Sequence, residues 1–168
     1  MDSRALFTRT LQATAVLTGS LLSGSMMTIS LLAIPVFFET TTSPSQLFQQ
    51  WMRMFHYGHR AHPAMAAITF SLYSYAAWRR SVENKPWGTL LMAGLVTTLM
   101  TPFTWILMLP LNGRIYELAT AGRENLGVTI REAKRLVGRW GAMHLVRSFF
   151  PLIGAGIGIK QMLGDLAA

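Results

Sequence analysis

The chain has 168 residues, of which 51% are hydrophobic and 13% are charged, and its formal net charge is +8. The charged share is about half that of a typical soluble domain, and the length fits one domain, residues 1–168. Because there is no cysteine, disulfides, iron–sulfur clusters and thiol nucleophiles are excluded. The Arg and Lys residues flank long apolar stretches, so their predicted partners are anionic lipid headgroups, and no nucleic-acid partner is expected.

The first predicted transmembrane helix covers residues 10–38, which contain no Asp, Glu, Lys or Arg. This run is longer than the ~20 residues that cross a bilayer, and longer than the apolar part of a cleaved signal peptide. Gly19 with Ser23, and Ser20 with Gly24, have the spacing that lets two helices approach closely in lipid. We therefore expect a retained helix that packs tightly against a neighbour.

A second helix is predicted to begin after Ser43, a preferred N-cap residue, with Pro44 in the first helical position and Gln46 completing a capping box. Its first turns mix aromatic and polar residues, which is typical of an amphipathic helix at the membrane interface. The uncharged stretch Ala61–Trp78 predicts that the helix then enters the membrane, with a kink at Pro63.

A third span is predicted over residues 87–109, with Pro102 in its middle and Pro110 just beyond its end. The sequence LNGRIYELATAG that follows indicates a short helix outside the hydrocarbon, which Gly122 would end.

The last helix is predicted to begin at a capping box formed by Thr129 and Glu132. It is basic at first and then apolar over residues 140–159, where Gly154 and Gly158 form a GxxxG pair. Such glycine faces permit a homo-oligomer.

The predicted fold is therefore an all-α membrane protein: a four-helix transmembrane bundle with short amphipathic extramembrane helices. Both termini share a side with the loop Arg79–Lys85, and residues 39–62 and 111–139 lie on the other side. Basic residues occur on both sides, so the positive-inside rule does not decide the orientation, although the basic short loop favours cytoplasmic termini. The four predicted spans are residues 10–38, 61–80, 87–109 and 140–159.

Three side chains in the last span indicate a polar cavity within the bundle. Trp140, His144 and Arg147 are spaced i, i+4 and i+7, so they project from one helix face. A guanidinium in hydrocarbon is costly and usually faces a bundle interior or a wet cavity. The simpler alternative is that Arg147 extends to the headgroups or forms a structural ion pair.

Prolines occur next to the same polar residues. A helical proline removes the hydrogen bond to the carbonyl four residues earlier, so Pro63 would free the carbonyl of His59 and Pro151 that of Arg147. Freed carbonyls at membrane depth are tolerated where protein groups or water satisfy them.

The segment MFHYGHRAHP carries three histidines, and their spacing leaves three interpretations open. His56 and His59 share a helix face and suit acid–base chemistry near neutral pH. Histidine pairs at this spacing also bind metals, although carboxylates are scarce nearby. The third interpretation is no function, and this is our expectation for His62 beside Pro63.

Further candidate residues lie near the end of the third span and beside the histidines. Trp105 lies within the span, and Asn112 and Arg114 lie just past Pro110, where they suit the mouth of a cavity. Asn112 alternatively caps the following helix. Together with Tyr57, an aromatic lining with a few polar groups suits a flat aromatic ligand.

Four segments in this order resemble the anthrone oxygenase family, small four-span membrane proteins of fungal aromatic polyketide pathways. The resemblance covers residues 15–159 and departs from the family at Gly113, where a second asparagine is common. The segments are LTGSLLSGSMMTISLLAIPV, QWMRMFHYGH, TPFTWILMLPLNGRIYEL and RWGAMHLVRSFFPLIGAGIG.

The resemblance implies oxidation of an anthrone to the anthraquinone by O2, without a cofactor, in a multi-pass protein of a fungal endoplasmic reticulum membrane. Such chemistry needs a base, donors for an oxyanion, and a dry aromatic slot. We therefore expect His59 or His56 to act as the base. The groups expected to hold the oxygen are His144, Arg147 and Asn112, and those expected to contact the substrate are Trp105, Trp140, Tyr57 and Arg114.

Two alternatives remain at this point. One is a metal-dependent membrane oxidoreductase that uses His56, His59 and His144, and the other is a non-catalytic membrane binding protein or scaffold.

Overall fold

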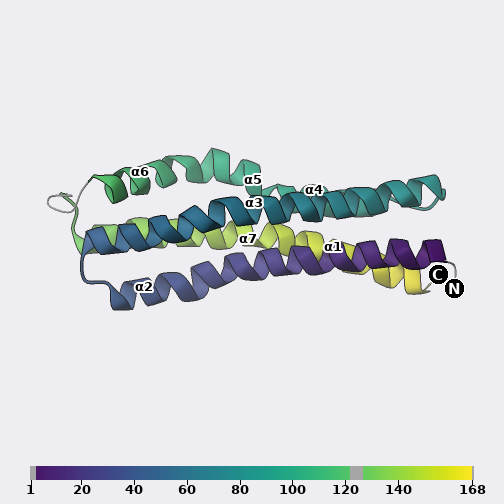
Figure 1. Cartoon of the computed structure of the whole chain (residues 1–168), viewed down its shortest axis with the longest axis horizontal. Helices are drawn as coiled ribbons and strands as arrows, with labels where there is room; N and C mark the ends of the chain where they lie inside the picture. The colour runs from purple at the N-terminus through teal and green to yellow at the C-terminus, as the bar shows by residue number, and fades with distance from the viewer. Residues whose placement is uncertain (1–2, 122–126, 168) are drawn as a thin grey trace.

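The computed structural model describes residues 3–121 and 127–167, and within them it is helical with no strand, which confirms the all-α prediction (Figure 1). The helices form four long rods. The first consists of α1 (Ser3–Thr28), the π-helical turn η1 (Ile29–Ala33) and α2 (Ile34–Thr40), and the second is α3 (Pro44–Val82). The third consists of α4 (Gly88–Thr98), α5 (Met100–Phe103), the π-helical turn η2 (Thr104–Met108) and α6 (Leu109–Thr120), and the fourth is α7 (Ile130–Ala167).

The four rods pack as a bundle in which α1 and α4 each contact both α3 and α7. Both termini lie at the end that also carries the α3–α4 connection, as the sequence predicts, and α2 and α6 lie at the opposite end (Figure 1). Three helical stretches are long and apolar enough to cross a membrane: Leu6–Thr40, Gly88–Thr120 and Ile130–Asp165. The remaining predicted span, residues 61–80, lies in α3, which does not reach the same hydropathy because polar residues and Pro63 interrupt its apolar part.

The amphipathic segments predicted next to the apolar spans are helical in the structure. The amphipathic segment after Ser43 is the first half of α3, which runs through Pro63 without a break. The basic segment after Thr129 is the first half of α7, and α6 continues directly from η2. A proline removes only one helical hydrogen bond, and α3 has buried residues on both sides of Pro63, including His62, Ala66 and Thr69. The predicted stop at Gly122 lies outside the described residues.

The predicted N-cap hydrogen bonds are present at both Ser43 and Thr129, and at Thr129 the capping box is reciprocal. The Ser43 hydroxyl accepts a hydrogen bond from the Gln46 amide at 3.3 Å. At the start of α7, the Thr129 amide donates to the Glu132 carboxylate at 2.9 Å, and the Glu132 amide donates back to the Thr129 hydroxyl at 3.3 Å. These local signals set the starts of α3 and α7.

Small residues pack the half of the bundle nearest the termini. A Cβ on Gly154 would collide with the Thr97 hydroxyl and the Ala93 carbonyl, and one on Gly158 would collide with the Tyr73 hydroxyl. The GxxxG pair is therefore used for packing within the chain rather than offered to a second copy.

Candidate active site

Two π-helical turns, η1 and η2, lie in the half of the bundle that contains α2 and α6. Each lies just before a proline, η1 before Pro35 and η2 before Pro110. Proline has no N–H for the carbonyl four residues earlier, so the helix widens locally to an i→i+5 pattern, as seen where the Ile34 amide bonds to the Ile29 carbonyl. Such turns often occur at functional sites.

An inner cavity of ≈ 240 Å³ lies beside these turns. This volume is slightly below the roughly 300–1,000 Å³ of typical small-molecule pockets, so the inner cavity suits one compact molecule. Its lining comes from all four rods and combines aromatic, apolar and a few polar side chains. The lining residues are Ile29, Met54, Phe55, Gly58, His59, Pro63, Met100, Thr101, Thr104, Trp105, Leu109, Asn112, Trp140, His144 and Arg147.

The π turns supply hydrogen-bond partners for two polar side chains of α7, the buried His144 and the half-buried Arg147. Arg147 donates from Nη1 to the Thr104 hydroxyl of η2 at 2.6 Å, and its buried Nε has no partner among the described residues. The His144 ring, which is 1% exposed, places Nδ1 3.2 Å from the Ser30 hydroxyl of η1. Arg147, the predicted charged group, is thus held inside the bundle and keeps N–H groups that can donate to a ligand.

Asn112 and Trp140 form the opposite edge of the polar lining. The Trp140 indole N–H donates to the Asn112 side-chain oxygen at 2.8 Å. The Trp140 ring also stacks on His144, with centroids 4.6 Å apart and planes 28° apart. Asn112 therefore does not cap a helix; it links α6 to α7 and fixes the indole beside the imidazole.

His62 is the main residue that sequence reasoning missed. It is 5% exposed, its ring centroid lies 5.9 Å from that of His144, and its Nδ1 has no partner among the described residues. Gly58 lies one turn earlier, and a Cβ there would make an ordinary van der Waals contact with the imidazole at 3.5 Å. This contact does not require glycine, so the i, i+4 spacing of Gly58 and His62 carried no signal for the burial of His62.

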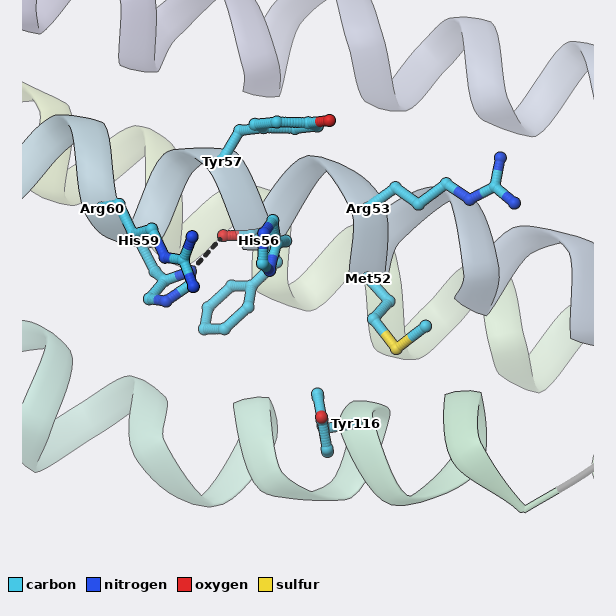
Figure 2. A pocket seen from close by; sticks show the side chains of 8 residues that line it. Met52, Arg53, His56, Tyr57, His59, Arg60 and Tyr116 are labelled. Atoms are coloured by element: carbon cyan, nitrogen blue, oxygen red, sulfur yellow. Dashed lines mark hydrogen bonds between the residues drawn. The ribbon is translucent and has the colours of Figure 1, made fainter.

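His56 and His59, by contrast, are exposed, and they line an outer cavity of ≈ 710 Å³ between α3 and α6 (Figure 2). His59 lines both cavities, whereas His56 lines only the outer one of the two. The outer cavity is lined by Met52, Arg53, Phe55, His56, Tyr57, His59, Arg60 and Tyr116.

The remaining predicted residues divide between the two cavities and the surface. Trp105 is 67% exposed but contributes to the wall of the inner cavity, and Tyr57, 75% exposed, belongs to the outer one. Arg114 is exposed, lies 3.6 Å from the Glu117 carboxylate, and is not among the side chains that line either cavity.

The metal-site alternative built from His56, His59 and His144 gains no support from the geometry. Within residues 3–121 and 127–167, no three His, Cys, Asp or Glu side chains are grouped closely enough to hold a metal ion. His144 is buried against α1, whereas His56 is exposed on the outer side of α3.

The fold and the inner cavity define a small helical protein with apolar membrane-length helices and an internal cavity lined by aromatic and a few polar side chains. Residues 51–157 match the family model described as anthrone oxygenase. The chain is 48% identical over 154 residues to anthrone oxygenase AgnL2 of Paecilomyces divaricatus, covering 90% of this chain and 94% of the relative.

Two further relatives agree. The noranthrone monooxygenase of Aspergillus flavus is 40% identical over 151 residues, with 89% of this chain and 72% of the relative covered. An anthrone oxygenase of Emericella nidulans is 36% identical over 183 residues, with 89% and 95% covered. No solved structure matches. The chain therefore belongs to the anthrone oxygenase family, a family of oxidoreductases, as its four segments predicted.

Proposed function

We propose that this protein oxidises an anthrone to the anthraquinone with O2 as co-substrate, in aromatic polyketide biosynthesis, and that the reaction takes place in the inner cavity. The observation that carries the proposal is the meeting of Arg147, His144 and Asn112 at one aromatic-walled cavity inside the bundle. The names of the relatives, anthrone oxygenase and noranthrone monooxygenase, support the same reaction.

The chemistry needs only acid–base and electrostatic help from the protein. The methylene carbon of the anthrone loses one proton to a base, giving an anthrolate, and this carbon forms a bond to O2, which is reduced to a peroxide. The base returns its proton to the outer peroxide oxygen. It then removes the second methylene proton while the O–O bond breaks, which leaves a carbonyl and releases hydroxide. The hydroxide takes that proton, so one anthrone and one O2 give one anthraquinone and one water.

His59 is the proposed base. Its Nδ1 lies 3.0 Å from the Phe55 carbonyl, which can only accept, so the ring proton is assigned to Nδ1 and the lone pair to Nε2. An imidazole with a free Nε2 at a cavity wall suits repeated proton transfer. His56, which lines only the outer of the two cavities, is less suited to this step.

Arg147 is proposed to hold the anthrolate oxygen, with His144 and Asn112 beside it. Arg147 uses Nη1 on Thr104, and its remaining N–H groups can stabilise negative charge in a site of low dielectric. Trp105 and Trp140 are proposed to flank the rings. His62 lies next to His144, with ring centroids 5.9 Å apart, and is not among the residues that line the inner cavity.

The test is oxygen-isotope labelling with detergent-purified, metal-analysed protein. An anthrone is bound without oxygen, and labelled O2 is then admitted. We expect one labelled atom in the new carbonyl, one O2 consumed per anthraquinone, and no loss of rate with a chelator. Conversion no faster than the spontaneous reaction would reject the proposal, and loss of activity with the chelator would restore the metal alternative.

The setting of the enzyme is also a proposal. The three relatives are fungal proteins, and the three apolar helices suit a multi-pass protein, which together support the endoplasmic reticulum membrane of a fungus, with anionic lipid around the basic flanks. A fluorescent fusion that failed to coincide with a reticulum marker would contradict this location. Gly154 and Gly158 pack against other helices of the same chain, so they do not support a homo-oligomer.

A further inference from the structure

The outer cavity is largely aromatic and carries two arginines, and of its lining residues the proposed reaction uses only His59. Two guanidinium groups, Arg53 and Arg60, and two imidazoles, His56 and His59, are among its eight lining side chains, none of which is acidic. Neither arginine forms an ion pair or a hydrogen bond with any residue in the described part of the chain. A hollow with unpaired cations and no carboxylate favours an anionic guest.

The spacing along α3 explains how the two arginines and His56 come together. Arg53, His56 and Arg60 follow one another at three- and four-residue steps, so they lie along one side of the helix over two turns, about 10 Å. Figure 2 shows Arg60, His56 and His59 next to one another on α3, with Tyr116 opposite them on α6. The outer cavity is therefore an elongated site with positive charge along one wall.

The aromatic side chains favour a planar guest over an acyl chain. Five of the eight lining residues carry rings. Phe55 and His59 are stacked, with centroids 5.3 Å apart and planes 13° apart, and Trp51 stacks on Phe55 behind them at 4.8 Å. Flat, parallel ring surfaces next to cations suit an aromatic molecule with an ionised substituent.

Phe55 and His59 also connect the outer cavity to the inner one, because both side chains line both cavities. In addition, Arg60 is the last charged residue before the uncharged stretch Ala61–Trp78, so the outer cavity lies at the level where polar and apolar surroundings meet. An amphiphilic aromatic molecule would arrive at this level.

From these observations, and resting on the proposed function, we propose that the outer cavity is a binding site for the oxyanion of the substrate before it passes Phe55 and His59. The substrate class is thereby narrowed to anthrones that carry a carboxylate or an ionised phenol at one edge. A lipid phosphate offers the same oxyanion chemistry, and the experiment separates these two sources.

The experiment measures binding in nanodiscs of uncharged phosphatidylcholine, by quenching of tryptophan fluorescence. The probes are an anthraquinone that bears one carboxylate and the same ring system with a hydroxymethyl group in its place. We expect the wild type to bind the carboxylated probe about tenfold more tightly, and the double variant R53Q/R60Q to lose this preference. The matched control R131Q/R135Q removes two exposed charges from α7 at the same end of the bundle and keeps the preference.

The outcomes distinguish the possibilities. Equal binding of both probes by the wild type, or an unchanged preference in R53Q/R60Q, would overturn the inference. Displacement of the carboxylated probe from the wild type by added phosphatidylglycerol, but not from R53Q/R60Q, would assign the site to lipid phosphate and overturn the aromatic guest. A carboxylate preference in a protein that fails the isotope-labelling test would reject the reaction and leave the anion site standing.

Discussion

The two halves of the bundle solve the packing problem in opposite ways. Near the termini, the buried core is built mainly from small residues around Tyr73, including Ala15, Ala76 and Ala93. Near α2 and α6, the core is built from large side chains, including Trp51 and Trp140. Small residues let backbones approach closely, and large rings hold them apart.

The two halves also differ in how an arginine is paired. In the half near the termini, Arg80 forms an ion pair with Asp165 and also donates to the Pro86 carbonyl at 2.5 Å. In the cavity half, Arg147 forms no ion pair with any described residue, and its Nε has no hydrogen-bond partner there. Buried neutral atoms without a partner occur in both halves, for example Gln12 Oε1 near the termini and His62 Nδ1 near the cavity, so the contrast lies in the arginines. An arginine without a counter-ion inside a bundle is expected where a ligand or a reaction uses it.

The two halves of the chain therefore contribute differently: the half near the termini stabilises the fold, and the half with the π turns forms the candidate site. We call the half with small residues around Tyr73 the clamp, and the half with the π turns and the inner cavity the container. If so, mutations in the first half should affect folding and activity together, and mutations in the second should affect activity with little loss of stability.

The largest expected effect is on the clamp. Gly154→Val places a branched side chain against the Thr97 hydroxyl and the Ala93 carbonyl, and a backbone atom cannot move aside cheaply. We expect a loss of about 3 kcal/mol or more in the free energy of unfolding, measured by SDS titration from mixed micelles. Gly156→Ala, on the open face of the same helix with no atom within 4 Å of the new methyl group, is the control and should unfold as the wild type does.

The next effect concerns Arg147, the cation in the wall of the inner cavity. Arg147→Gln keeps a donor for Thr104 but removes the charge proposed to hold the anthrolate oxygen. We expect kcat/KM for an anthrone to fall roughly 10²–10³-fold, measured by O2 uptake, with an SDS midpoint close to that of the wild type. Arg139→Gln, an exposed position on the same helix, serves as the charge control. Equal losses in both variants would mean that Arg147 does not act at the reaction.

The proposed base is tested by chemical rescue. His59→Ala should lower kcat about 10²-fold, because the carbon acid then has no positioned proton acceptor. External imidazole should restore part of this activity, since His59 is exposed and open to both cavities. Arg147→Gln, which lacks a cation rather than a base, should not respond to imidazole. A rescue of both variants, or of neither, would contradict the assignment.

Much of the fold could be predicted because it is encoded locally. Uncharged runs marked three of the apolar helices, and Ser43 and Thr129 marked the starts of α3 and α7. The sequence also predicts that α3 and α7 are each one helix with an amphipathic and an apolar half, and the structure shows both as continuous. What continues α3 past Pro63 is burial against other rods, which composition does not reveal.

The candidate site was only partly predictable. The i, i+4, i+7 spacing identified the α7 side chains that line the inner cavity, because a straight helix fixes their direction. The histidines of α3 were predicted less well. His56 was expected at the site and His62 was expected to have no function, but His62 is buried beside His144 and His56 is exposed. Which face of α3 turns inward is decided by Trp51 and its contacts with α7, so it depends on packing between distant segments.

The smallest effect should come from Ser30, the η1 residue whose hydroxyl lies 3.2 Å from His144 Nδ1. Ser30→Ala removes one neutral hydrogen bond, so we expect roughly a twofold to tenfold loss of kcat/KM and about 1 kcal/mol of stability. Ser25→Ala removes a hydroxyl that bonds only to the Leu22 carbonyl of its own helix, and it is the control. An effect of Ser30→Ala no larger than that of Ser25→Ala would show that the π turn shapes the cavity without orienting the imidazole. Activity would then depend on the width of the inner cavity at η1, and the hydrogen bond between Ser30 and His144 would not contribute to it.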